Sequence, residues 1–135
     1  MPSFSWEPAY SVDVDSMDSR HKKIFDHMAT IHHTLSDKQH IDSIDEMVDK
    51  FDIYCKMHFY EEERLMEGMN FPSIAEHRRQ HDLLVLNLDR FRSADLAGLD
   101  QNFADEFEKI KNWFVNHILT EDMRYSEFYL GKHRN

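Results

Sequence analysis

The chain has 135 residues, with only 3 glycines and 3 prolines, and a formal net charge of −10. This length suits one domain with a single core, and the scarcity of Gly and Pro among many helix-forming residues indicates an all-α fold. The negative charge argues against nucleic acids and anionic membrane surfaces as partners, because both select clustered Lys and Arg.

The sequence carries no sign of a targeting or membrane segment. Residues 1–8 contain neither a basic region nor an apolar run long enough for a signal peptide. No window approaches the roughly 18 apolar residues of a membrane helix. The single cysteine, Cys55, cannot form an internal disulfide, which fits a reducing compartment. We therefore expect a soluble, cytoplasmic protein.

The first helix is expected after an N-terminal arm. Residues 1–17 contain two prolines, and we expect them to lack regular structure and to pack along the body of the domain. Asp18 or Ser19 can cap a helix that runs to about Leu35. His21 extends its apolar stripe. The apolar residues of the arm and of this stripe are Trp6, Tyr10, Val12, Val14, Ile24, Phe25, Met28, Ile31 and Leu35.

Three more long helices and a short one follow. Apolar residues at helical spacing predict helices over about 41–66, 72–92 and 101–119, and a short last helix over about 121–130. Short polar links join them at residues 36–40 and 93–100. The sequence therefore predicts an all-α, up-down-up-down four-helix bundle with an N-terminal arm and a short C-terminal helix, in a single domain spanning residues 1–135.

Each predicted long helix carries polar side chains on its buried face. They are His21, the pair His58 and Glu62, the pair His77 and His81, and His117 with Asp122 behind it. A spacing of four is about 40° of rotation, so those pairs share a face. A spacing of five is about 140°. His117 and Asp122 can therefore converge only if the helix ends or kinks between them, and Thr120 begins a polar turn there.

Together these side chains predict a metal site. One histidine on an apolar stripe is usually a hydrogen-bonded core residue. Five imidazoles and two carboxylates in one small core would each cost on the order of 1–3 kcal/mol without ligation, and metal binding removes that cost. The absence of cysteine from the set argues against iron–sulfur clusters and Cys-type zinc sites.

The composition of the set favours iron, with manganese or zinc still open. No His-Glu-x-x-His motif of a zinc protease is present, because Arg78 follows His77. Seven ligands are too many for one ion. Two octahedral ions have twelve ligand positions. If two bridging carboxylates fill four of them, one bridging oxygen fills two and five histidines fill five, eleven positions are occupied. One position stays open for a small ligand.

These motifs resemble those of the hemerythrin family, and particularly its bacterial single-domain members. The resemblance covers nearly the whole chain. The residues that carry it are Trp6, Tyr10, Asp18-Ser19-Arg20-His21, His58-Phe59-Tyr60-Glu61-Glu62, His77-x3-His81, Trp113-Phe114-Val115-Asn116-His117-Ile118 and Asp122. Asp13 stands where the family usually has Gly, and Phe114 replaces a Leu often found beside the O2 site.

The resemblance implies a definite division of the ligands between two iron ions. One iron would take His77, His81 and His117. The other would take His21 and His58 and keep the open position for O2. Glu62 and Asp122 would bridge the pair together with an oxo or hydroxo group.

The resemblance also implies reversible O2 binding, in carriage, storage or delivery. Delivery would involve an O2-consuming acceptor protein that the sequence does not identify. Binding of this kind needs a dry pocket, and Phe59, Trp113, Phe114 and Ile118 lie next to ligand positions and could form its walls. Ordinary core packing explains each of these four equally well. The larger ring of Phe114 could slow ligand entry.

Two other functions remain open. One is a di-iron enzyme of the oxidase, peroxidase or NO reductase type, and the other is a sensor of O2 or redox state. Oxygen-activating bundles use paired Glu-x-x-His motifs, which the buried stripes lack. We find no second domain for signalling, so the sequence favours O2 binding over both alternatives.

Several polar residues near these motifs are expected to lie outside the site. His27, His33, His40 and His133 fall in loops or off the stripes and are predicted to be surface residues. His32 shares the face of His21 but should lie near a bundle end. Glu61 and Glu63 are predicted to be solvated neighbours of Glu62.

Overall fold

The computed structural model describes residues 4–37, 43–93 and 102–133. Its elements in chain order are η1 (Pro8–Tyr10), α1 (Asp15–Asp37), α2 (Ile44–Gly68), α3 (Ile74–Ser93), α4 (Asn102–His117), η4 (Ile118–Asp122) and α5 (Met123–His133). The predicted links at residues 38–40 and 94–100, with His40, lie outside the described residues, and so does the side chain of His133.

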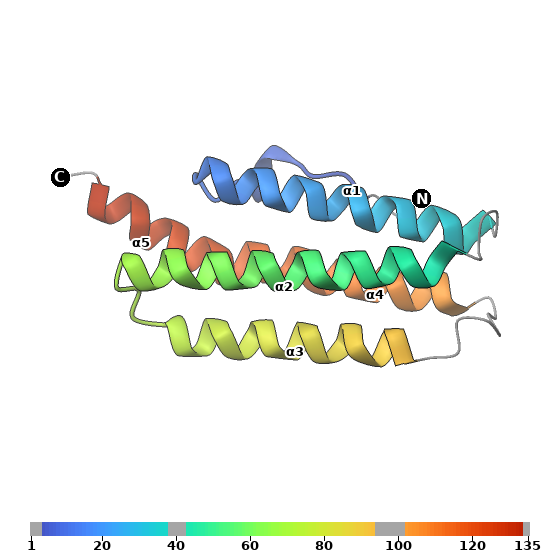
Figure 1. The fold of residues 1–135 in the computed structure, drawn as a ribbon. Helices are drawn as coiled ribbons and strands as arrows, with labels where there is room; N and C mark the ends of the chain where they lie inside the picture. The colour runs from blue at the N-terminus through green and yellow to red at the C-terminus, as the bar shows by residue number, and fades with distance from the viewer. Residues whose placement is uncertain (1–3, 38–42, 94–101, 134–135) are drawn as a thin grey trace.

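The four long helices lie side by side and alternate in direction (Figure 1). α1 packs against α2 and α4, and α3 packs against the same two helices, so the helices close into a ring around one core. The core consists of the apolar stripes that the sequence predicts, with Ile24, Met28 and Cys55 among its fully buried members. The prediction of an up-down-up-down four-helix bundle is confirmed.

The N-terminal arm packs on the bundle, but α1 begins earlier than predicted. Asp18 does not cap the helix, because α1 already starts at Asp15. The Asp18 carboxylate instead accepts hydrogen bonds from Ser11 Oγ at 2.6 Å and from the backbone N–H of Val12 at 2.9 Å. Asp13, which lies between Val12 and Asp18 in the chain, has a φ of 58°. Glycine adopts this left-handed conformation most readily, and Asp tolerates it better than most residues.

The turn after α2 also contains a non-glycine residue with left-handed backbone. α2 ends at Gly68, two residues after the predicted end, and Asn70 has left-handed backbone with a φ of 57°. The backbone N–H of Phe71 then donates to the carbonyl of Met66 at 3.0 Å. This bond satisfies a carbonyl that the helix end would otherwise leave without a partner. The tight turn sets α3 antiparallel to α2.

Within the described ranges, none of the helices is both long and apolar enough to cross a membrane.

Candidate metal centre

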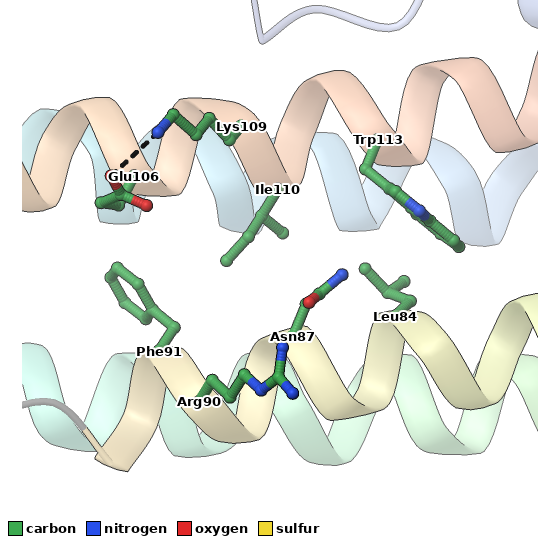
Figure 2. A pocket seen from close by; sticks show the side chains of 8 residues that line it. All are labelled: Leu84, Asn87, Arg90, Phe91, Glu106, Lys109, Ile110 and Trp113. Carbon is green, nitrogen blue, oxygen red and sulfur yellow. Dashed lines mark hydrogen bonds and ion pairs between the residues drawn. The ribbon is translucent and has the colours of Figure 1, made fainter.

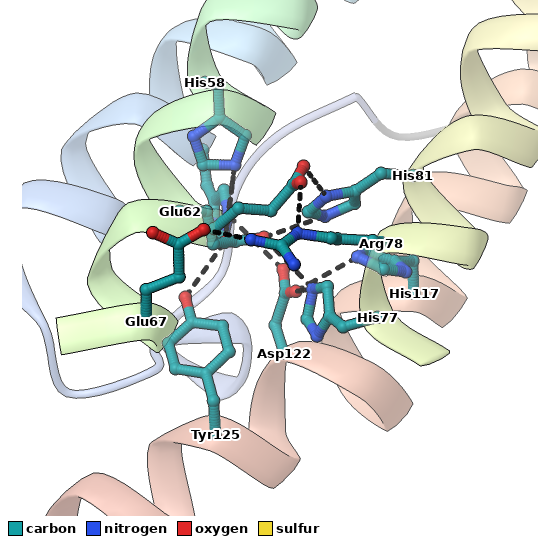
Figure 3. Close-up of polar contacts among 11 residues, drawn as sticks. His58, Glu62, Glu67, His77, Arg78, His81, His117, Asp122 and Tyr125 are labelled. Carbon is teal, nitrogen blue, oxygen red and sulfur yellow. Dashed lines mark hydrogen bonds and ion pairs between the residues drawn. The ribbon is translucent and has the colours of Figure 1, made fainter. Parts of the chain in front are cut away.

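All seven side chains that the sequence selects converge at one level of the bundle. α1 contributes His21, α2 contributes two, α3 contributes two, and the last two come from α4 and η4. Each is at most 2% exposed. Figure 3 shows most of this cluster between the helices. The seven residues are His21, His58, Glu62, His77, His81, His117 and Asp122.

Glu62 divides its two carboxylate oxygens between two groups of histidines. Its Oε1 lies 3.2 Å from His77 Nε2 and 3.0 Å from His81 Nε2. Its Oε2 lies 3.4 Å from His21 Nε2 and 3.5 Å from His58 Nε2. One carboxylate therefore faces two separate sets of imidazole nitrogens, one set with each oxygen.

Asp122 also divides its two carboxylate oxygens between histidines. Its Oδ1 lies 2.9 Å from His77 Nε2 and 3.1 Å from His117 Nε2, and its Oδ2 lies 3.4 Å from His21 Nε2. The side chains form one potential metal-binding group with three histidines and both carboxylates, and a second with His21, His58 and Glu62. In this second group the two Nε2 atoms lie 3.0 Å apart.

The π-helical turn η4 brings His117 and Asp122 together. The sequence spacing of five predicted that the helix ends or kinks between them. The regular helix α4 does end at His117, and the chain continues as a wider π-helical turn over Ile118–Asp122. In a π-turn the hydrogen bonds run from i to i+5, so residues five apart return to one face. The hydroxyl of Thr120 donates to the carbonyl of Asn116 at 2.7 Å, which gives that carbonyl a partner at the widened turn.

Charges inside the cluster shift the pKa values of its members in opposite directions. Burial alone would lower the pKa of His77, but the adjacent carboxylates of Asp122 and Glu62 outweigh it and raise the pKa to about 10. Burial lowers the pKa of His58 to about 3. Burial and the neighbouring Glu62 would raise the pKa of Asp122, but His117 and His77 lower it to about 2. The carboxylates are thus stabilised as anions and require nearby positive charge.

Several buried atoms of the cluster lack hydrogen bonds. Both oxygens of Asp122 and Nε2 of His117 have no hydrogen-bonding partner of acceptable geometry. Leaving buried polar atoms unsatisfied costs about 1–3 kcal/mol each. Cations coordinated by these atoms would remove that cost and balance the carboxylates. The chemistry of the donor set, five imidazoles and two carboxylates, therefore fits metal ions such as iron.

Aromatic rings surround the imidazoles. Phe59 stacks on His81, with ring centroids 4.2 Å apart and an interplanar angle of 16°. Trp113 stacks on His117 at 5.1 Å and 8°. Phe114 meets His21 edge-on at 5.8 Å and is 1% exposed. Ile118 is fully buried, and these four residues are the ones that the sequence suggested as pocket walls.

Two residues that contact the cluster were missed by sequence reasoning. Tyr125 is fully buried, and its hydroxyl donates to Glu62 Oε2 at 2.9 Å. A tyrosine on a buried stripe needs a partner for its hydroxyl, and this was the available signal. Glu63 was predicted to be solvated, and that prediction is wrong. Its Oε2 lies 3.0 Å from His81 Nδ1, because α3 packs close to this turn of α2.

Arg78 pairs with Glu63, the carboxylate that contacts His81. Its guanidinium donates from Nε to Glu63 Oε1 at 3.1 Å and also pairs with Glu67 (Figure 3). Glu61, by contrast, pairs with Arg20 on the surface of the bundle.

Three other histidines lie away from the cluster. His32 is half-buried and packs against Phe4 with ring centroids 4.6 Å apart. His27 contacts Tyr54, and His33 pairs with Asp37 at 2.9 Å. None of the three belongs to a potential metal-binding group of the described residues.

Comparison with known proteins gives one consistent result. Residues 12–129 match the family described as hemerythrin HHE cation binding domain. A bacteriohemerythrin of Stenotrophomonas maltophilia (strain R551-3) is 28% identical over 123 residues, covering 90% of this chain and 78% of that protein. A hemerythrin-like protein of Naegleria gruberi is 30% identical over 122 residues, covering 90% of each chain.

The solved structures that resemble this chain include hemerythrins. A crystal structure of wild-type hemerythrin superposes with a TM-score of 0.79 at 28% identity, covering 91% of this chain and 95% of that one. A hemerythrin mutant superposes with a TM-score of 0.80 at 28% identity and covers 94% and 97%.

Proposed function

The chain belongs to the hemerythrin family, and we propose that it is a non-haem di-iron protein that binds O2 reversibly. The observation that carries this proposal is the division of the oxygens of Glu62 and Asp122 between two groups of imidazoles. A carboxylate that offers one oxygen to each of two groups is suited to bridge two metal ions.

The two groups suggest different roles for the two ions. We assign His77, His81 and His117 to one iron and His21 and His58 to the other, with Glu62 and Asp122 as bridges. The second iron receives one histidine fewer and so retains a position for an exogenous ligand. When bound, a pair of ferrous ions supplies the two electrons with which O2 is held.

The protein's own residues protect this position from water. Phe114 covers His21, and Phe25 packs against Phe114 with ring centroids 5.9 Å apart. Both rings are at most 1% exposed. An apolar wall excludes water and prevents proton leakage at the site. The hydroxyl of Tyr125 holds Glu62 in position through its 2.9 Å hydrogen bond.

The donor set favours binding over turnover. Five of the seven side chains are imidazoles, whereas carboxylate-rich bundles that activate oxygen take most donors from Glu residues. We therefore propose a role in O2 carriage, storage or delivery, and not an enzyme. Delivery would involve an acceptor protein that consumes O2.

The experiment is reconstitution with ferrous iron, followed by metal analysis and a visible spectrum under air. We expect about two irons per chain, as the two groups require, and an oxygenated form that decays slowly and releases O2 under vacuum. Fewer than two irons in fully reconstituted protein would reject the dinuclear site. Rapid conversion to the diferric form with turnover of a reductant would instead favour an enzyme.

A further inference from the structure

A cavity of about 440 Å³ lies between α3 and α4, outside the candidate metal centre. Figure 2 shows its two walls, one formed by each helix. Its lining is mostly apolar, and pockets that bind small organic molecules have this size and this character. The apolar members of the lining are Leu84, Phe91, Ile110 and Trp113.

The polar members of the lining are arranged unevenly. On the α4 wall, Lys109 Nζ pairs with Glu106 Oε1 at 3.0 Å (Figure 2), so their charges offset one another. On the α3 wall, Asn87 and Arg90 face the cavity. Within the described part of the chain, neither of these two side chains has a hydrogen-bonding or ionic partner. The lining therefore carries one uncompensated positive charge beside a free amide.

Arg90 differs from the other arginines whose side chains the structure describes. The chain has 26 acidic and 16 basic side chains, and Arg20, Arg64, Arg78, Arg79 and Arg124 each contact a carboxylate or a hydroxyl oxygen. Arg90 instead borders a cavity. Guanidinium groups bind carboxylates with two parallel hydrogen bonds, and the amide of Asn87 can add a third donor.

We propose that this cavity binds a small organic monocarboxylate with a planar apolar body. The carboxylate would bind Arg90 and Asn87, and the body would lie between the rings of Trp113 and Phe91 and the side chain of Ile110. A monoanion matches the single uncompensated charge, whereas a phosphate dianion would lie beside Glu106 with only one free cation. Aromatic side chains favour stacking with a planar ligand.

The site is separate from the candidate metal centre. None of the residues that line the cavity is one of the seven clustered side chains. Trp113 lines the cavity and also stacks on His117. Binding to the cavity can therefore be measured without O2 and does not depend on the proposed function.

The test is calorimetric titration of the iron-loaded protein with 2-naphthoate, with 2-naphthamide as the uncharged analogue. We expect one molecule of 2-naphthoate per chain and about ten-fold weaker binding of the amide, because each charge-assisted contact is roughly twice as strong as a neutral one. Arg90→Gln should lower the affinity for 2-naphthoate by about ten-fold or more for the same reason.

Arg79→Gln is the matched control. Arg79 lies on the same helix and pairs with Glu76 at 2.8 Å, but it does not line the cavity. This variant removes the same charge and should bind 2-naphthoate as the wild-type protein does. If Arg90→Gln also binds like wild type, or if the amide binds as well as the acid, the assignment of the carboxylate to Arg90 is wrong.

Fluorine NMR locates the bound probe. The chain contains two tryptophans, and after labelling with 5-fluorotryptophan the resonance of Trp113 should shift on titration while that of Trp6 stays in place. Trp6 serves as an internal reference because it lies on the arm, under Lys22 of α1, and does not line the cavity. No binding of 2-naphthoate up to millimolar concentration, or a shift of Trp6 alone, would overturn the proposal.

Discussion

The Nδ1 atom of His81 lies 3.0 Å from Oε2 of Glu63, and Nε2 of the same ring lies 3.0 Å from Glu62 Oε1. Of the five clustered imidazoles, only His81 has a partner for its outer nitrogen among the described residues. This contact places the proton on Nδ1 and directs the lone pair of Nε2 into the cluster. Arg78 holds Glu63 in place from the other side.

Glu63→Ala should therefore weaken metal binding. Loss of an outer carboxylate partner of a metal-binding histidine typically lowers metal affinity by about 10- to 100-fold. Competition with a chelator of known affinity measures the change. Glu61→Ala is the control, because Glu61 pairs with Arg20 at the surface. Equal iron affinity in the two variants would show that Glu63 does not position His81.

Tyr125→Phe should destabilise the protein, because it removes the only hydroxyl that donates to Glu62 within the described residues. The loss of a buried hydrogen bond to a carboxylate costs about 1.5–3 kcal/mol. Urea denaturation measures the free energy of unfolding. Tyr60→Phe removes a hydroxyl from a residue that is 60% exposed and should change stability by less than about 0.5 kcal/mol. Similar losses in both variants would contradict a role for the Tyr125 hydroxyl.

Phe114→Leu should admit ligands faster. The smaller side chain opens space beside His21, so O2 association and autoxidation should both speed up by several-fold, at a cost in stability on the order of 1 kcal/mol. Stopped-flow mixing with O2 and the decay of the oxygenated spectrum measure the two rates. Phe51→Leu alters a core ring that contacts Phe107, away from the cluster. It should lower stability without changing either rate, and matching kinetics in the two variants would rule out Phe114 as a gate.

His21→Ala and His32→Ala should differ in iron content. His21 lies in the cluster, whereas His32 packs against Phe4. We expect His21→Ala to lose iron from one of the two positions and His32→Ala to keep both irons. Metal analysis after reconstitution distinguishes them. If His32→Ala lost iron and His21→Ala did not, the ligand assignment would be wrong.

Removal of iron should lower the melting temperature. A metal that binds only the folded state adds stability according to its concentration and affinity, by about 4 kcal/mol at a thousand-fold excess over the dissociation constant. For a chain of this size that corresponds to a shift of roughly 10 °C or more. Thermal unfolding with and without a chelator measures it. An unchanged melting temperature would mean that the cluster is stable without a cation.

The helices and the seven clustered residues could be predicted because both follow from the helical repeat of the sequence. Apolar residues recur with helical spacing, and polar residues on the same stripe must then lie in the core. His58 and Glu62 are one turn apart, so their common face followed from the sequence alone. The bundle topology followed from the short links between helices.

The contacts that sequence reasoning missed depend on how neighbouring helices are aligned. Glu63 is one residue from Glu62 and looks like a surface position on α2 taken alone. It meets His81 only because α3 packs at a particular height and rotation, which the period of a single helix does not specify. The start of α1 depended likewise on Asp18 turning back to the arm.

The widened turn η4 has a consequence for the whole C-terminal end. One extra residue in a turn rotates everything after it by about 100° relative to a regular α-helix. That rotation turns Tyr125 towards Glu62 and Ser126 towards the arm, where its hydroxyl donates to the carbonyl of Val12 at 2.7 Å. A family member that shortened this segment by one residue would lose Asp122, Tyr125 and the anchor of the arm in a single step. The length of this segment therefore matters to the site as much as its side chains do.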